Sequence, residues 1–209
     1  MKKPKYCTIY LVRHGKTDWN TKQLVQGHTD IPLNEEGKIQ AKEAAQNLKH
    51  IKFDKVFSSD LLRASQTAEI IAKEHDLIVE ATAVLRERNF GILEGNPIEK
   101  LKELRRLMAK MEDNKRVSYK HHPSIESDNE VISRFLTFLR EAAIASPGKV
   151  ILVVCHGGLL RVLLTHFGIM PYADVRVNNL AHIKLESDGV EFFVKEIFGI
   201  EAEKSTASS

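Results

Sequence analysis

The chain of 209 residues has only two cysteines, Cys7 and Cys155, and both lie in apolar runs typical of buried strands. Two such residues are too few for the disulfide framework of small secreted proteins, so we expect reduced thiols and a cytoplasmic protein. No apolar run approaches the ~20 residues that cross a membrane. The basic residues near the N-terminus are not followed by a long apolar segment, which argues against a signal peptide.

The sequence also has no large excess of charge of either sign. Lys and Arg total 31, Asp and Glu total 28, and the net charge is +3. The basic residues form no block, so we expect no nucleic-acid partner. Metal-ligand spacing such as His-Glu-x-x-His is missing, and we expect neither a metal nor another cofactor. The hydrophobic content of 43% and the chain length suit one soluble domain with a sizeable core.

Short apolar runs alternate along the chain with amphipathic segments. The runs predict buried parallel strands at 7–12, 55–59 and 150–154, with a weaker candidate at 77–80. Alternating segments on both sides of Asp188-Gly189 predict a β-hairpin. The pattern predicts an α/β three-layer sandwich, in which a mostly parallel sheet with one antiparallel edge strand has helices on both faces. We expect a single domain over residues 1–200 and a disordered tail at 201–209.

Polar residues mark the starts of the helices between these strands. Asn34 is suited to cap one helix, and Asp60 is suited to cap the next. Ser127 and Glu130 have the spacing of a capping box, and the last helix is expected to begin at Gly157.

Charged residues and histidines recur where the predicted strands end. Arg13 and His14 follow the first strand, Arg63 lies about one turn into the helix after the second, and His156 follows the strand at 150–154. Glu87 lies in a further charged stretch. Each alone is most simply a surface residue. Because ligands bind beyond the carboxyl ends of strands in α/β sheets, their recurrence there favours one shared site.

Five segments of the sequence resemble the histidine phosphatase superfamily, which has the phosphoglycerate-mutase-like fold. The first is "LVRHGKTDWN", which resembles the family signature of Arg-His-Gly followed by Glu or Lys and Thr. The others occur in family order: "QGHTDIPLNEEG", "FSSDLLRASQTAEII", "LRERNFGILEG" and "VVCHGGLLRVLL". They cover nearly the whole chain except the tail and Lys100–Ile125. One segment alone is a moderate signal, whereas five in order are specific.

The resemblance implies catalytic roles for five residues. His14 would be the nucleophile and become phosphorylated, as a neutral imidazole is suited to do. Arg13, Arg63 and, if protonated, His156 would bind the transferring phosphoryl oxygens. Glu87 would protonate the leaving oxygen and then deprotonate the attacking water. These cations would take the place of a metal ion.

The resemblance also implies binding residues and a lid. Asn20, Gln26 and Gly27 match positions that line the family's phosphate pocket, and Gly157 would lie at a helix N-terminus, which attracts anions. The family inserts a lid over the substrate, here at about 96–126. Four lid residues are open candidates for substrate contact: Arg105, Arg106, His121 and His122.

Three function classes fit this resemblance: a phosphatase, a cofactor-dependent phosphoglycerate mutase and a non-catalytic phospho-ligand binder. The binder is disfavoured because every catalytic position holds the expected residue type. Mutases carry Glu-Arg-His-Tyr-Gly where residues 87–91 read Glu-Arg-Asn-Phe-Gly, and the connection that follows is shorter here. We therefore expect a histidine acid-type phosphatase that acts, without a metal, on a small phosphorylated metabolite. Fructose-2,6-bisphosphate, phosphoserine and α-ribazole phosphate stay open as substrates, and so does a homodimer.

Overall fold

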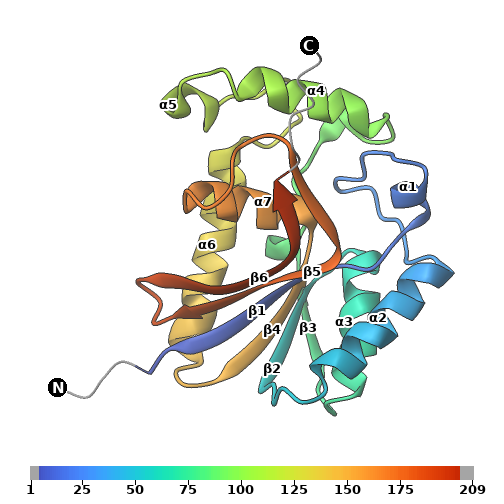
Figure 1. Ribbon diagram of the computed structural model, residues 1–209, viewed down its shortest axis with the longest axis vertical. Helices are drawn as coiled ribbons and strands as arrows, with labels where there is room; N and C mark the ends of the chain where they lie inside the picture. Colours follow the sequence, from blue (N-terminus) through green and yellow to red (C-terminus); the bar gives the residue numbers. More distant parts are fainter. Residues whose placement is uncertain (1–4, 203–209) are drawn as a thin grey trace.

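The computed structural model describes residues 5–202 and is built around a six-stranded sheet in the order β3-β2-β4-β1-β5-β6 (Figure 1). Strands β1 to β4 pair in parallel, β5 pairs antiparallel with β1, and β6 pairs antiparallel with β5. The α/β fold is thus confirmed. The strands are β1 (Cys7–Arg13), β2 (Lys55–Ser59), β3 (Val79–Thr82), β4 (Val150–Cys155), β5 (Val175–Ser187) and β6 (Phe192–Ala202).

The antiparallel edge of the sheet contains two strands rather than the single one we expected. The predicted hairpin at Asp188-Gly189 joins β5 to β6, and Gly189 has the positive φ of 95° that such turns favour. Strand β6 includes Glu201 and Ala202, which the sequence predicts to lie in a disordered tail. Their backbones pair with Arg176 and Val175 of β5, and this pairing does not depend on apolar side chains. The rest of the predicted tail, 203–209, lies outside the described residues.

Helices cover both faces of the sheet (Figure 1). Along β1, Ile9 and Leu11 pack into the core under α6 and α7, whereas Tyr10 and Val12 pack into the core under α2 and α3. This alternation is the two-residue period of a strand that is buried on both faces. The helices are α1 (Asp18–Thr21), α2 (Glu35–Leu48), α3 (Leu62–Lys73), α4 (Ile98–Met108), α5 (Asp113–Arg116), α6 (Asp128–Ala145) and α7 (Gly157–His166), with 3₁₀ turns at η1 (Ala83–Leu85) and η2 (Gly91–Leu93).

Two of the three predicted helix caps are confirmed. The Asn34 side chain accepts from the N–H of Gly37, and Ser127 forms its capping box with Glu130. The prediction for Asp60 is wrong, because α3 begins after Leu61 without a side-chain cap. The Asp60 carboxylate instead accepts two hydrogen bonds from Arg86, at 2.8 and 2.6 Å. Such a two-pronged ionic pair is stronger than a single bond to a backbone N–H.

The segment 96–126 lies beyond the sheet rather than within its layers. Figure 1 shows α4 and α5 above α7, at the end of the molecule where α1 also lies. Among the described residues, no helix is long and apolar enough to span a membrane.

Candidate active site

A cavity of about 670 Å³ lies beyond the carboxyl ends of β1 and β4. Its wall is formed by parts of β1, α3, α4, α7 and β5 together with the loops after β1 and β3. All the predicted site residues except His156 line it: Arg13, His14, Asn20, Gln26, Gly27, Arg63, Glu87 and Gly157. His156 is fully buried behind this wall, with its ring centroid 5.2 Å from that of His14. The fold therefore brings together residues that are up to 144 positions apart in the sequence.

His14 is held in a fixed orientation at the end of β1. Its backbone N–H donates to the Cys155 carbonyl at 3.0 Å, and its Nδ1 lies 2.7 Å from the Gly15 carbonyl oxygen. Because a carbonyl oxygen only accepts hydrogen bonds, Nδ1 must carry the proton of the neutral ring. Burial, with the charges of Arg13 and Arg63, lowers the pKa of His14 well below its usual range. Nε2 is therefore the ring nitrogen with a free lone pair.

Arg63 and Arg13 present charge to the cavity. The fully buried Arg63 donates from Nη1 to the Thr29 carbonyl at 3.0 Å and from Nη2 to the Gly27 carbonyl at 2.7 Å. Arg13 donates to the Val177 carbonyl. Burial lowers the pKa of each guanidinium to about 10, so both stay charged at neutral pH.

Several buried polar atoms around this cavity have no protein partner. They include Nε of both Arg13 and Arg63, Oε1 of Gln26 and both ring nitrogens of His156. Buried donors are normally hydrogen-bonded, so the unpaired Nε–H groups of Arg13 and Arg63 mark a place where an anion can bind. Burial and the charges of nearby Arg63 and Arg13 lower the pKa of His156, so this ring is neutral at neutral pH.

Glu87 is buried, with 8% of its surface exposed, and backbone hydrogen bonds fix its carboxylate. Its Oε1 accepts from the N–H of Arg88 at 2.8 Å, and its Oε2 accepts from the N–H of Gly158 at 2.9 Å. The second bond places the carboxylate at the N-terminus of α7. A Cβ on Gly158 would lie 2.1 Å from Glu87 Oε1, so only glycine allows this approach.

The predicted binding residues from the β1–α2 connection lie at the cavity wall. Asn20 Oδ1 accepts from the N–H of Thr17 at 3.1 Å, which fixes the turn of α1 after the His14 loop. Gly27 adopts a φ of 56°, and its carbonyl is the one that binds Arg63. A side chain at position 27 would therefore be strained, and its Cβ would lie 2.1 Å from Glu94 Oε1.

Three residues that the sequence did not indicate position this site. Asn179 donates from Nδ2 to the His14 carbonyl at 3.0 Å. Thr67 Oγ1 accepts from the N–H of Gly15 at 3.0 Å, which links α3 to the loop of His14. No local pattern marks either residue.

Glu94 is the third of these residues and holds the loop that binds Arg63. Its carboxylate accepts from the N–H of His28 and of Thr29, both at 2.9 Å, and from the Thr29 hydroxyl at 2.7 Å. It also accepts from the N–H of Phe90 at 3.1 Å. Its position in the charged stretch that contains Glu87 was the only signal available.

Of the four open lid candidates, only Arg105 lines the cavity. The neighbouring Arg106 is exposed and forms an ion pair with Asp174 at 2.9 Å. His121 is exposed, and Nδ1 of His122 lies 2.8 Å from the Ser124 hydroxyl. Neither histidine lines the cavity. Among residues 5–202, no three His, Cys, Asp or Glu side chains are grouped to hold a metal ion.

The buried histidines make the stability of the fold depend on pH. His14 and His156 are neutral when folded, but both bind a proton in the unfolded chain below about pH 6.5. The unfolded state then binds more protons than the folded state, so stability falls as the pH drops below 6.5. Above pH 6.5 these two histidines do not affect stability. Between its folded pKa and pH 6.5, each histidine should lower the free energy of unfolding by up to about 1.4 kcal/mol for each pH unit of acidification.

Urea unfolding at pH 7.5 and 5.5 measures this effect. The loss of unfolding free energy on acidification should be smaller in His156→Gln than in the wild type. Parallel losses in the two proteins would mean that His156 is protonated in the folded state.

A model of the histidine phosphatase superfamily (branch 1) matches residues 9–198. The chain is 38% identical over 157 residues to the uncharacterized phosphatase PhoE of Bacillus subtilis, covering 75% of each protein. It is also 38% identical over 160 residues to phosphoglycerate mutase-like protein 4 of Arabidopsis thaliana, covering 76% of this chain and 70% of that protein.

Solved structures agree with this relationship. A phosphoserine phosphatase variant from Entamoeba histolytica, in complex with phosphoserine, superposes with a TM-score of 0.78 at 27% identity, covering 92% of this chain and 96% of that one. A phosphoglycerate mutase from Bacillus anthracis superposes with the same TM-score at 26% identity, covering 92% and 93%. The chain therefore belongs to the histidine phosphatase superfamily, branch 1, whose members include its phosphatase and phosphoglycerate-mutase-like relatives.

Proposed function

We propose that the protein hydrolyses small phosphomonoesters, without a metal ion, through a phosphohistidine formed on Nε2 of His14. The observation that carries this proposal is the 2.7 Å contact between His14 Nδ1 and the Gly15 carbonyl oxygen. It assigns the ring proton to Nδ1 and leaves the Nε2 lone pair for attack, in a cavity whose wall includes Arg13 and Arg63.

In the first step, the Nε2 lone pair forms a bond to phosphorus while the bond to the leaving oxygen breaks. Arg13 and Arg63 stabilise the charge on the equatorial oxygens, because their donors are in place before the reaction begins. The Glu87 carboxyl group gives its proton to the leaving oxygen, which departs as an alcohol. Its anchoring to the N–H of Gly158 keeps the carboxyl group beside the phosphoryl site.

In the second step, water attacks the phosphohistidine. The Glu87 carboxylate accepts a proton from this water, the phosphorus–nitrogen bond breaks, and its electron pair returns to Nε2. Inorganic phosphate leaves, and both His14 and Glu87 are restored to their starting protonation states. No redox change or metal ion is required.

The apolar wall beside Glu87 favours hydrolysis over phosphoglycerate isomerisation. Phe90, where mutases carry tyrosine, lines the cavity and packs with Val25 and Leu101 in a small apolar cluster. Asn89 does not line the cavity, and its Oδ1 accepts from the N–H of Gly91 at 2.8 Å. A mutase must hold a bisphosphorylated intermediate, and these two positions offer it no cationic or hydroxyl contact.

The proposal is tested with protein that has been exhaustively treated with EDTA. Given 3-phosphoglycerate and a bisphosphoglycerate primer, it should form 2-phosphoglycerate slowly compared with its release of phosphate from a good phosphomonoester. Phosphate release and isomerisation are measured in parallel. Efficient isomerisation would favour the mutase alternative, a requirement for an added divalent ion would contradict the metal-free mechanism, and binding without turnover would favour the binder.

A further inference from the structure

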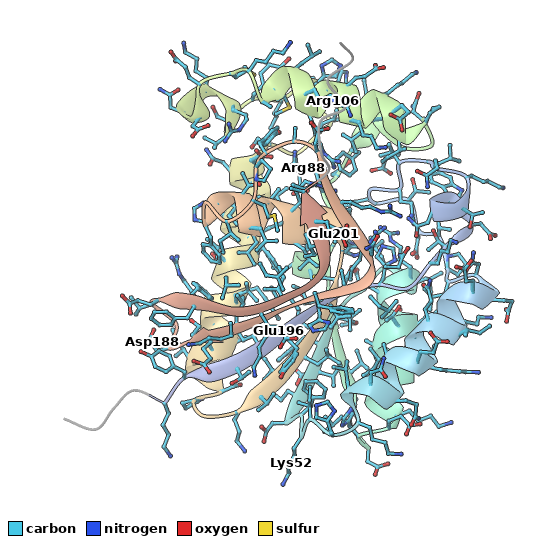
Figure 2. All side chains as sticks on the ribbon, in the orientation of Figure 1. Lys52, Arg88, Arg106, Asp188, Glu196 and Glu201 are labelled. Carbon is cyan, nitrogen blue, oxygen red and sulfur yellow. The ribbon has the colours of Figure 1, made fainter. Side chains whose placement is uncertain are left out.

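Glu87, the proposed proton donor, belongs to a segment that has no helix or strand of its own to hold it. Residues 86–90 lie in coil between η1 and η2. Figure 2 shows Arg88, the residue that follows Glu87, in the space between α4 and α7. The position of the Glu87 carboxylate therefore depends on the contacts that other segments make with this coil.

The main chain of Glu87 is held at its carbonyl oxygen. His28 Nε2 lies 2.8 Å from this oxygen, and Arg134 donates to it from Nη2 at 3.1 Å. Because a carbonyl oxygen only accepts hydrogen bonds, His28 Nε2 must carry a proton and donate it. The oxygen has two lone pairs, so both donors can bind it together. His28 thus fixes the main chain of the residue whose side chain must reach the leaving oxygen.

Arg134 supports the coil as a whole rather than Glu87 alone. It belongs to α6 and donates from Nη1 to the carbonyls of Val84 and Arg86, at 2.6 and 2.8 Å. It also forms an ion pair with Glu126 at 3.0 Å. A change at Arg134 would therefore disturb several segments at once.

His28 instead connects Glu87 to the loop that orients Arg63. The residues on either side of it are Gly27 and Thr29, whose carbonyls accept from Nη2 and Nη1 of Arg63. The His28 side chain is half-buried and does not line the cavity, so it acts on the reaction through other residues. One ring thus links the proposed proton donor to the cation that binds the phosphoryl group.

We propose that His28 is a positioning residue, whose ring holds the Glu87 carboxyl group at the leaving oxygen of a phosphoryl group bound by Arg63. The inference rests on the proposed function, because it concerns the proton-donation step of that mechanism. A misplacement of about 1 Å in a reacting group can cost about 10²-fold in rate. Loss of the His28 hydrogen bond should therefore slow the reaction where a proton is needed and have little effect elsewhere.

Substitutions at position 28 differ in whether they can replace the donor. The amide nitrogen of glutamine reaches as far as a histidine Nε2, whereas that of asparagine lies one methylene group short, and alanine has no donor. The substrates are benzyl phosphate, which has an alkoxide leaving group, and p-nitrophenyl phosphate, which carries a ring of the same size. The rate of His14 phosphorylation is measured for each in single-turnover experiments.

The expected signature is a loss that depends on the leaving group. His28→Ala and His28→Asn should slow phosphorylation by benzyl phosphate by about 10- to 100-fold, and by p-nitrophenyl phosphate by less than about threefold. His28→Gln should restore most of the rate with benzyl phosphate. Circular dichroism confirms that each variant is folded.

A double variant shows whether His28 acts through Glu87. With Glu87→Gln no carboxyl proton is available, so adding His28→Ala should change the benzyl phosphate rate by less than about threefold, whereas independent effects would multiply. Glu94→Gln is the matched control, because Glu94 binds the backbone N–H of His28 and holds the same loop, but a carboxylate cannot donate to the Glu87 carbonyl. It should slow both substrates by similar factors.

The outcomes separate this inference from the proposed function. If Glu87→Gln distinguishes the two leaving groups but His28→Ala slows both alike, the mechanism stands and the inference is overturned, since His28 would then only shape its loop. Multiplying effects in the double variant, or no recovery with His28→Gln, would also overturn it. If Glu87→Gln did not distinguish the leaving groups, or benzyl phosphate did not phosphorylate the wild type, proton donation by Glu87 would fail and the inference with it.

Discussion

Replacing His14 with alanine should abolish phosphoryl capture and reduce kcat by roughly 10⁴- to 10⁶-fold, the usual effect of removing a covalent nucleophile. No neighbouring group offers an equivalent. The nearest ring, that of His156, is fully buried and does not line the cavity. Arg13 and Arg63 remain protonated at neutral pH and lack a lone pair for attack.

The measurement is a rapid-mixing experiment with ³²P-labelled substrate, quenched in alkali because phosphohistidine is labile to acid. Wild-type protein should yield labelled peptide containing His14, and His14→Ala should yield none. His50→Ala is the control, because His50 is exposed just after α2 and does not line the cavity. Acid-stable label on a hydroxyl group, or undiminished activity of His14→Ala, would contradict the mechanism.

The residues that the sequence located best are those fixed by local chain geometry. Arg13 is the last residue of β1 and His14 follows it, whereas His156 lies between β4 and α7, which begins at Gly157. A strand-end pattern is enough to place all four residues. Parallel strands bring their carboxyl ends to one edge of a sheet, which makes the convergence predictable before any contact is known. The family resemblance then supplied expected roles for the same positions.

Contacts between distant segments could not be predicted in this way. The bond between Glu87 and the N–H of Gly158 joins residues 71 positions apart, and neither residue has a local pattern that implies the other. Asn179 reaches the His14 carbonyl next to Leu180, whose φ of 58° is unusual for a leucine. The local pattern predicts that Asp60 caps a helix, but its carboxylate pairs with Arg86, which lies 26 positions away in the sequence.

The lid segment shows the same limit at the scale of a single residue. Arg105 and Arg106 are adjacent and chemically identical, yet Arg105 lines the cavity and Arg106 faces solvent. Successive residues of a helix point about 100° apart, so the orientation of α4 decides which arginine lines the cavity. That orientation depends on the packing of Leu101 and Met108, which are buried, and not on the arginines themselves.

Replacing Glu87 with glutamine should slow the phosphorylation of His14 by about 10²- to 10⁴-fold with alkyl phosphates and only weakly with p-nitrophenyl phosphate. An alkoxide is a poor leaving group and needs a proton as the phosphorus–oxygen bond breaks. Nitrophenolate leaves readily without one. Single-turnover kinetics are required, because Glu87 is also proposed to assist the water step that both substrates share.

Glu94→Gln provides the matched control for this experiment. Glu94 is a carboxylate held by backbone N–H groups, as Glu87 is, but it acts on the loop that binds Arg63. Weakening that loop should impair stabilisation of the phosphoryl group for every substrate. Glu94→Gln is therefore expected to slow both leaving groups by similar factors, and only Glu87→Gln should separate them.

The geometry of Glu87 also determines how the variant must be checked. Both carboxylate oxygens accept from backbone N–H groups, so an amide at this position must turn its NH₂ towards the N–H of Arg88 or of Gly158. A displaced side chain would disturb the N-terminus of α7 and slow both substrates alike. A difference between the two leaving groups therefore reports proton donation and not displacement. Equal slowing of phosphorylation for both substrates would mean that another group protonates the leaving oxygen.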